Sequence, residues 1–172
     1  STRVRSSAAS DVYKRQIRAY VAERSNLEAA SDMLAGSLFA GIAFSWARLG
    51  NIHAMSHPVS AFYNVPHGVA NGILFPYIVK YNEEAAFQKY QKIYHYISPE
   101  KKNASEFSKG MLEQAVRELN TQVGIPAKLS DAGVTDEHFS QMTDDAMKSG
   151  NIAVNPWKTG WEDILALYKE AL

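Results

Sequence analysis

The feature that most constrains the fold is a succession of helix-length segments with helical spacing of apolar residues, running from Ile17 to Leu172. Strict alternation of apolar and polar residues, the pattern of a half-buried strand, is almost absent. Short stretches containing Gly, Asn and Pro separate the segments, and these residues are typical of helix ends. The pattern predicts an all-α fold, a single helical domain of about seven helices with short connections.

The residues before Ile17 differ in character from the rest. The stretch STRVRSSAASDVYKRQ, residues 1–16, begins without Met, is rich in Ser, Ala and Arg, and resembles a translated sequencing adapter. We therefore expect residues 1–16 to be a non-native tail and assign residues 17–172 to the helical domain. A natural polar N-terminal arm is the alternative.

The first long segment, NLEAASDMLAGSLFAGIAFSWARLG, predicts a central and largely buried helix. Asn26 is expected to cap its N-terminus, with Glu28 in the first turn. Small residues between the large apolar ones suit the close approach of a neighbouring helix. No apolar run approaches the roughly 18 to 20 residues that a membrane span requires, so we expect no membrane partner.

Proline positions predict how the next segments begin and end. Pro58 is expected to end or kink a short helix that carries His53 to His57, because its ring disfavours helix in the preceding residue. A loop over 59–65 then leads to Pro66, which fits the first position of a helix over 67–81.

Four further helix boundaries are expected downstream. EEAAFQKYQKIYHYI, residues 83–97, predicts a separate amphipathic helix, and Gly124 is expected to end the helix after it. Another helix should open on Thr135. Thr159 and Glu162 have capping-box spacing, so they are expected to start the last helix.

Composition excludes several classes of partner and chemistry. Eighteen basic side chains balance 18 acidic ones, so no net field favours nucleic acid or an anionic membrane. With no cysteine, disulfides, thiolate metal sites and cysteine nucleophiles are excluded, and any metal must use nitrogen and oxygen ligands. Small molecules or proteins are the expected partners, and the cytoplasm is the expected location.

Three of the five histidines fall between residues 51 and 68. His53 and His57 are four residues apart and share one helix face. His67 stands at the predicted start of the next helix, where it could meet the other two. Small and apolar neighbours predict a dry pocket, in which neutral imidazole is a good metal ligand. The spacing alone leaves open a merely packed or solvated pair, and a metal would need further ligands from elsewhere.

The stretch GNIHAMSHPVSAFYNVPHGVANGILFPYIVKYN resembles the signature of the iron-containing, group III alcohol dehydrogenase family, which runs H-x-x-x-H, nine residues, then PHG-x-x-N. Segments on both sides of it also resemble that family. They are GSLFAGIAFSWARLG upstream, and VGIPAKLSDAGVTDEHF and GNIAVNPWKTGWEDILALY downstream. The likeness covers residues 26–172. One departure is Ser60, which stands where the family commonly has Gly.

The resemblance implies roles for particular residues. His53 and His67 match two ligands of a metal that the family holds with one Asp and three His. His57 matches the histidine near the nicotinamide and substrate, which is thought to help carry the proton. Phe44 falls where the family lines the cofactor pocket with an apolar side chain. Gly68 is expected to let the helix start approach its neighbours closely.

By this resemblance the chain is the C-terminal, metal-binding helical domain of an alcohol dehydrogenase that uses NAD or NADP and acts on a small alcohol or aldehyde. The implied metal is Fe²⁺, with Zn²⁺ as the alternative. We expect the N-terminal nucleotide-binding domain to be missing, the fragment alone to be inactive, and the full-length enzyme to be a homo-oligomer. A free-standing helical module that binds metal or protein without catalysis is the alternative.

Overall fold

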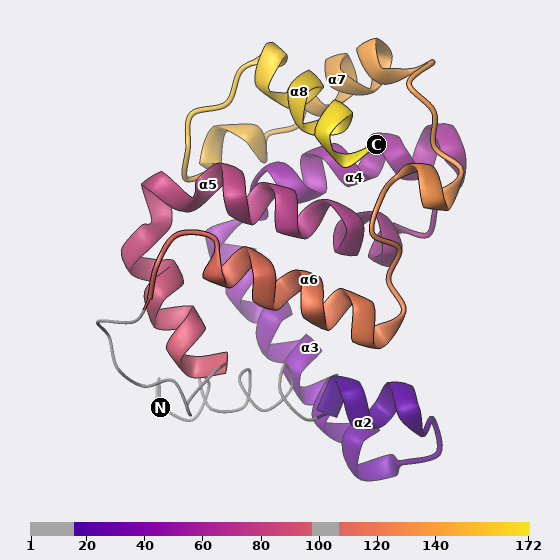
Figure 1. Ribbon diagram of the computed structural model, residues 1–172, viewed down its shortest axis with the longest axis vertical. Helices are drawn as coiled ribbons and strands as arrows, with labels where there is room; N and C mark the ends of the chain where they lie inside the picture. Colours follow the sequence, from indigo (N-terminus) through magenta and orange to yellow (C-terminus); the bar gives the residue numbers. More distant parts are fainter. Residues whose placement is uncertain (1–15, 98–106) are drawn as a thin grey trace. The chain divides into compact units, whose positions relative to one another are not determined.

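The computed structural model describes residues 16–97 and 107–172, so most of the expected non-native tail lies outside the described residues. Within these two ranges the regular secondary structure is entirely helical, and no strand is present. The α-helices in these ranges are α2 (Ile17–Ala22), α3 (Leu27–Ala47), α4 (Gly50–Tyr63), α5 (His67–Ile97), α6 (Met111–Val123), α7 (Phe139–Met147) and α8 (Trp161–Ala171) (Figure 1). Two short 3₁₀ helices, Ser130–Ala132 and Ile152–Val154, lie between them. The all-α prediction is confirmed.

The contacts divide the chain into two compact units. One unit comprises Ser1–Ala47 and Gln88–Ser108, and the other comprises Arg48–Phe87 and Lys109–Leu172. The three clustered histidines belong to the second unit, whereas α3 belongs to the first.

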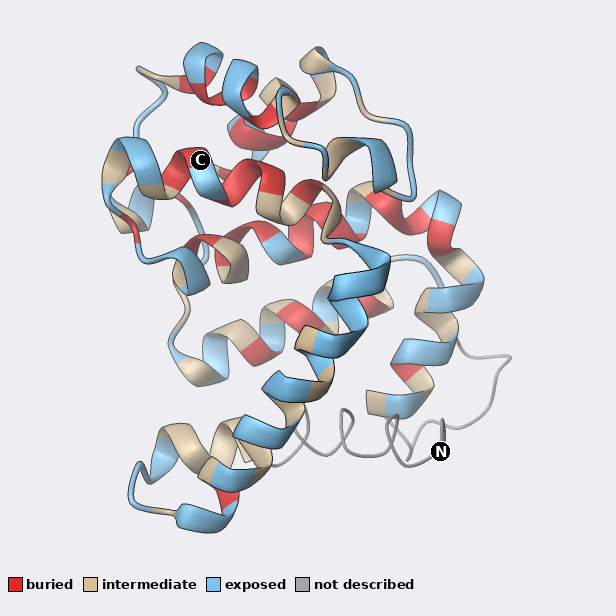
Figure 2. Cartoon of the chain, turned by 180° about the vertical axis from the view of Figure 1, so that it is seen from behind, coloured by how far each residue is buried: buried red, intermediate tan, exposed pale blue. Residues whose placement is uncertain are grey.

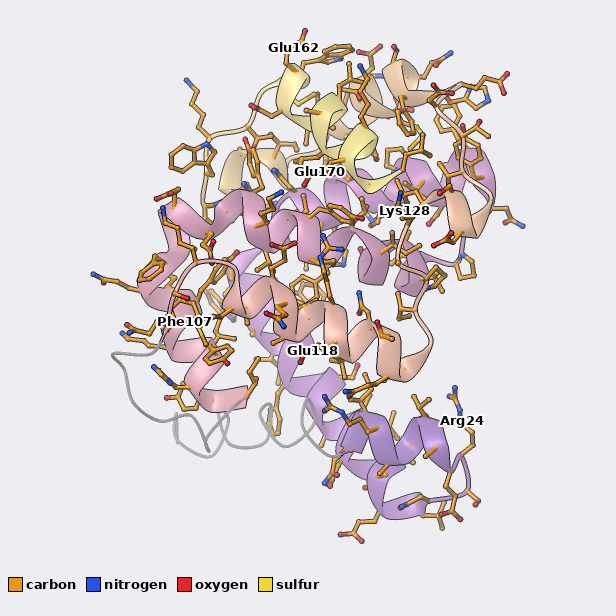
Figure 3. All side chains as sticks on the ribbon, viewed as in Figure 1. Arg24, Phe107, Glu118, Lys128, Glu162 and Glu170 are labelled. Carbon is orange, nitrogen blue, oxygen red and sulfur yellow. The ribbon has the colours of Figure 1, made fainter. Side chains whose placement is uncertain are left out.

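The core of the second unit is built from α4, the first half of α5, α7 and α8, which supply most of its buried side chains (Figure 2). Its fully or almost fully buried members are Met55, Val59, Val65, Ala70, Ile73, Leu74, Tyr77, Ile78, Leu129, Val134, Phe139, Met142, Ala146, Ile164, Leu167, Tyr168 and Ala171. Exclusion of this apolar surface from water is the main force holding α4 and α5 in place. An ion pair also connects α5 to α8. Nζ of Lys80 lies 2.6 Å from Oε1 of Glu170, which is labelled in Figure 3.

The helix α4 does not end at Pro58, so that alternative of the prediction is wrong, while the other alternative, a kink, stays a prediction. The helix continues through Pro58 to Tyr63, so most of the expected loop over 59–65 is helical. A proline inside a helix removes one backbone hydrogen bond, but Pro58 and Val59 are both buried. Burial of these apolar side chains offsets the lost bond, and the helix persists.

The predicted break before residue 83 is also absent, because α5 is one continuous helix of 31 residues that contains Pro76. Two other boundaries agree with the sequence. Asn26 accepts a hydrogen bond from the backbone N–H of Ala29 at 3.0 Å, as an N-cap does. Gly124 ends α6 in the left-handed conformation at φ 77°.

The starts of α7 and α8 differ from the predictions by one to four residues. At α8 the backbone N–H of Gly160 donates to Asp163 at 2.8 Å, so Thr159 and Glu162 do not form the expected capping box. Glu162 is exposed in the first turn of α8 (Figure 3). Thr159 instead accepts a hydrogen bond from the side chain of Asn51, a partner more than a hundred residues away in sequence.

The expectation that α3 is largely buried is wrong. Among its described residues only Ala29 is buried, and the helix is mostly exposed in Figure 2. Large apolar side chains that face solvent on α3 are Leu27, Leu34, Leu38, Ile42, Phe44 and Trp46. By length and composition α3 could cross a membrane, since an 18-residue window within its 21 residues reaches a mean hydropathy of 1.3. The expectation that no segment approaches a membrane span is therefore also wrong, although one such helix is weak support for a membrane partner.

Candidate metal centre

The three histidines of the motif are placed by the turn between α4 and α5. His53 and His57 share one face of α4, four residues apart. The helix ends at Asn64, which adopts the left-handed conformation at φ 54° and turns the chain back. The carbonyl of Pro66 then accepts hydrogen bonds from the first turn of α5, and His67 is the first residue of that helix.

The three imidazole rings lie together. The ring centroids of His53 and His67 are 5.2 Å apart, and those of His57 and His67 are 5.0 Å apart and stacked. His53 and His57 meet edge to face at 6.1 Å. The i, i+4 spacing brings the first pair together, and the short turn at Asn64 adds the third ring.

Hydrogen bonds fix how the rings of His53 and His67 face. The side-chain amide nitrogen of Asn71 lies 3.0 Å from Nε2 of His67 and 3.5 Å from Nε2 of His53. Ser56 Oγ donates to the carbonyl of His53 at 3.5 Å and lies 3.4 Å from Nδ1 of His67. Since Ser56 has one proton and gives it to that carbonyl, Nδ1 of His67 is the donor and its Nε2 carries a lone pair.

The cluster is only partly shielded from water. His53 is half-buried, whereas His57 and His67 are exposed, so the expectation of a dry pocket around the three histidines is wrong. Burial lowers the pKa of His53, and the neighbouring imidazoles of His67 and His57 lower it further. This shift favours neutral imidazole, the form that binds a metal.

The residues present fit two ligands of a divalent metal. Nε2 of both His53 and His67 points at one amide group, so the two nitrogens face the same small volume. In the described ranges, however, no group of three or more His, Asp, Glu or Cys side chains is arranged to hold a metal ion. A metal bound by this pair would need further ligands, and the described residues 16–97 and 107–172 arrange none beside it.

Two other predicted features have different outcomes. Phe44 lies on α3 in the first unit and is 47% exposed, and its role beside a nicotinamide stays a prediction. The expected close packing at Gly68 is wrong, because no atom lies within 4 Å of a Cβ built there. The close approach occurs one turn later, at Gly72, where a Cβ would lie 3.0 Å from Cγ2 of Ile125.

Sequence reasoning missed the side chains that hold α4 from outside the motif. The buried hydroxyl of Tyr168 on α8 donates to the carbonyl of Met55, between His53 and His57, at 2.7 Å. Asn155 accepts a hydrogen bond from the backbone N–H of Asn51, at the start of α4, at 3.3 Å. Only the NP dipeptide and a tyrosine within an apolar helix mark these positions in the sequence, and neither signal indicates a partner.

The fold is a helical domain that brings three imidazoles together where α4 and α5 meet. Residues 6–172 match the C-terminal domain model of the Fe-containing alcohol dehydrogenase family, and the chain belongs to that family.

Named relatives agree with this assignment. The chain is 37% identical over 158 residues to 1,3-propanediol dehydrogenase of Citrobacter freundii, covering 91% of this chain and 41% of that protein. It is 38% identical over 145 residues to lactaldehyde reductase of Escherichia coli K12, covering 84% of this chain and 38% of that protein. The chain thus spans about two fifths of the length of these curated relatives.

Solved structures show the same fold. The crystal structure of a 1,3-propanediol oxidoreductase matches with a TM-score of 0.86 at 34% identity, covering 98% of this chain and 44% of that one. Alcohol dehydrogenase from Oenococcus oeni matches with a TM-score of 0.89 at 32% identity, covering 99% of this chain and 45% of that one.

Proposed function

We propose that this chain is the metal-binding helical part of an alcohol dehydrogenase that interconverts a small alcohol and its aldehyde with NAD or NADP. The observation that carries the proposal is the meeting of His53, His57 and His67, with neighbouring ring centroids 5.0 to 6.1 Å apart, in a member of this family. The matched relatives named as 1,3-propanediol dehydrogenase and lactaldehyde reductase support this substrate class.

His53 and His67 would hold the metal through Nε2, with Fe²⁺ as the first candidate and Zn²⁺ as the second. When bound, the metal supplies a Lewis acid for the substrate oxygen and the nicotinamide supplies the hydride chemistry. Asn71 and Ser56 support the ligand form of His67 by leaving its Nε2 unprotonated. The missing ligands and the nucleotide-binding domain would come from sequence outside this chain.

His57 is the candidate catalytic residue. Its ring stacks on His67 at 5.0 Å and is exposed, so it borders both the metal ligand and water. An imidazole ring both accepts and donates protons at its nitrogens, so it is able to move a proton between the substrate hydroxyl and solvent. We assign it this proton transfer and contact with the nicotinamide, and we assign Phe44 an apolar contact with the cofactor.

The exposed apolar face of α3 supports the remaining partner proposals. Its six large apolar side chains are 47% to 89% exposed. Large apolar side chains exposed together are typical of a surface that contacts another domain or protein. We propose that the nucleotide-binding domain covers part of the helical domain in the whole enzyme, that this enzyme is a homo-oligomer, and that it works in the cytoplasm.

The decisive experiment extends the natural reading frame upstream of the Gln16/Ile17 junction and expresses the resulting protein. We expect the extended protein, loaded with Fe²⁺ or Zn²⁺, to reduce NAD⁺ or NADP⁺ in the presence of short alcohols, measured as absorbance of the reduced cofactor. An extended, metal-loaded protein without alcohol-dependent reduction of either cofactor would refute the proposal.

Single substitutions in that extended protein separate the assigned roles. His53→Ala and His67→Ala are expected to lower both metal content and turnover. His57→Ala should keep the metal and lose turnover by about 10²- to 10⁴-fold, the contribution of a general acid–base group. His95→Ala, on α5 outside the cluster, is the matched control and should change neither quantity.

The 172-residue chain alone is expected to bind zinc weakly and to oxidise no alcohol. Two imidazoles provide fewer bonds and less preorganisation than a complete ligand set. Anaerobic titration calorimetry tests this expectation. Stoichiometric binding with a submicromolar Kd would show that the described pair is already a complete site.

A further inference from the structure

Asn71 contacts both candidate metal ligands at the nitrogen that would bind the metal. Its amide nitrogen lies 3.0 Å from Nε2 of His67 and 3.5 Å from Nε2 of His53. His67 and Asn71 are four residues apart on α5, so they share a helix face, while His53 approaches from α4. One side-chain amide thus joins the two helices across the cluster.

Because the side-chain nitrogen of Asn71 can only donate hydrogen bonds, both imidazole rings must be in one particular tautomer. An –NH₂ group has two donors and no acceptor, so it binds two Nε2 atoms only if both carry lone pairs. The proton of each neutral ring must then be on Nδ1. Ser56 leads independently to the same form for His67, because its oxygen accepts from Nδ1.

A metal ion would compete with Asn71 for these two lone pairs. A metal–imidazole bond is about 2.0 to 2.1 Å long, and a lone pair engaged by a metal is not available to an N–H donor. The other end of the amide has no competing contact that would hold it, since Oδ1 of Asn71 is buried without a hydrogen-bond partner in the described structure. The side-chain amide of Asn71 is therefore held in place only by its hydrogen bonds to His53 and His67, which metal binding would break.

We propose that Asn71 is a positioning residue that holds the place of the metal. In the metal-free chain its amide keeps the Nε2 lone pairs of His53 and His67 directed at one point, with Ser56 fixing the tautomer of His67. Metal entry displaces the amide from both rings. This inference rests on the proposed function, in which these two histidines are metal ligands.

The first measurement is the tautomer of each ring in the metal-free, 172-residue chain. Long-range ¹H–¹⁵N NMR at about pH 8, where imidazoles are neutral, distinguishes protonated from unprotonated ring nitrogens. We expect unprotonated Nε2 and protonated Nδ1 for both His53 and His67. A protonated Nε2 on either ring would overturn the proposal, because Asn71 could not then donate to it.

The second measurement follows the side-chain –NH₂ signals of Asn71 during titration with zinc. We expect them to shift together with the Nε2 signals of His53 and His67, with one midpoint. The amide of Asn120, which donates to the carbonyl of Gly72 at 2.7 Å, is the internal reference and should stay unchanged.

The outcomes of the zinc titration separate this inference from the proposed function. Ring signals that shift while Asn71 stays unchanged would refute the placeholder role and leave the ligand pair intact. Ring signals that do not respond at millimolar zinc would refute the ligand pair, and the placeholder role with it.

Substitutions provide a third and independent readout. Asn71→Ala is expected to shift the ratio of the two His67 tautomers about fivefold, the effect of one lost hydrogen bond. Ser56→Ala should shift it in the same direction. Ser60→Ala is the matched control on the same helix, since Ser60 Oγ is buried with no hydrogen-bond partner, and should leave the ratio unchanged. An unchanged ratio in Asn71→Ala would contradict the proposal.

Discussion

Asn155, in the segment before α8, pairs its side-chain amide with that of Asn82 on α5 and also bonds the start of α4. Its side chain donates to Oδ1 of Asn82 at 2.7 Å, and Asn82 donates back to Oδ1 of Asn155 at 3.0 Å. The same Oδ1 accepts the backbone N–H of Asn51 at 3.3 Å, in the first turn of the helix that carries His53. Asn82 is only 4% exposed, so water has little access to replace these bonds.

The replacement Asn155→Ala should be costly. It leaves the buried side-chain nitrogen of Asn82 without its acceptor, which costs about 1 to 3 kcal/mol. It also removes the side-chain acceptor for the N–H of Asn51, a loss of about 1 kcal/mol by analogy with N-caps. We expect the free energy of unfolding to fall by about 3 kcal/mol. At about 2 to 4 °C per kcal/mol for a chain of this size, Tm should fall by about 6 to 12 °C.

Urea unfolding followed by circular dichroism measures this loss. Asn151→Ala is the matched control, because it lies in the same segment and its side chain makes no described hydrogen bond, and it should stay within about 0.5 kcal/mol of the wild type. A double-mutant cycle with Asn82→Ala should give a coupling energy above about 1 kcal/mol. Coupling below about 0.5 kcal/mol, or equal losses in Asn155→Ala and the control, would refute the reasoning.

Further predictions concern the packing around the cluster. Burial holds the pKa of Tyr168 far above its usual value of 10.0. Above that pH the tyrosine ionises in the unfolded chain but not in the folded chain, so the free energy of unfolding falls as pH rises. Tyr168→Phe removes the bond to Met55, should cost about 1 kcal/mol at neutral pH, and should flatten this alkaline loss in urea titrations at several pH values. Gly72→Ala places a Cβ 3.0 Å from Ile125 and should destabilise the chain by about 1 kcal/mol, whereas Gly68→Ala meets no atom and should be neutral or stabilising by up to about 1 kcal/mol. Equal signs for the two glycine variants in urea unfolding would contradict the packing argument.

Helix existence could be predicted from local sequence, but several helix boundaries could not. Asn26 caps the helix that follows it, and Gly124 ends α6 in the left-handed conformation, so both predictions are confirmed. Both effects depend only on residues nearby in the sequence. Pro58 failed as a stop signal because its local cost is smaller than the gain from burying its helix. Thr159 failed as a cap because its hydroxyl bonds a residue remote in sequence.

The burial of α3 could not be predicted from its composition. Its apolar residues suggested a central helix, yet its large side chains face solvent within this chain. The apolar composition of a helix favours burial but does not say which residues cover it. How far α3 is buried is decided by tertiary packing.

For the candidate site, the sequence determined the identity and local spacing of the histidines. His53 and His57 share a face because of helix geometry alone, and the likeness of the surrounding motif to the iron-containing alcohol dehydrogenase family predicts metal chemistry. These inferences depend on interactions within a few residues.

Tertiary structure decided the rest. The turn at Asn64 brings His67 to within 5.2 Å of His53, measured between ring centroids, and Asn71 and Ser56 then set which nitrogen of His67 is free. Hydrogen bonds depend on distances of a few tenths of an ångström between groups on separate helices. Those distances are set by how whole helices pack, and no local sequence pattern contains them.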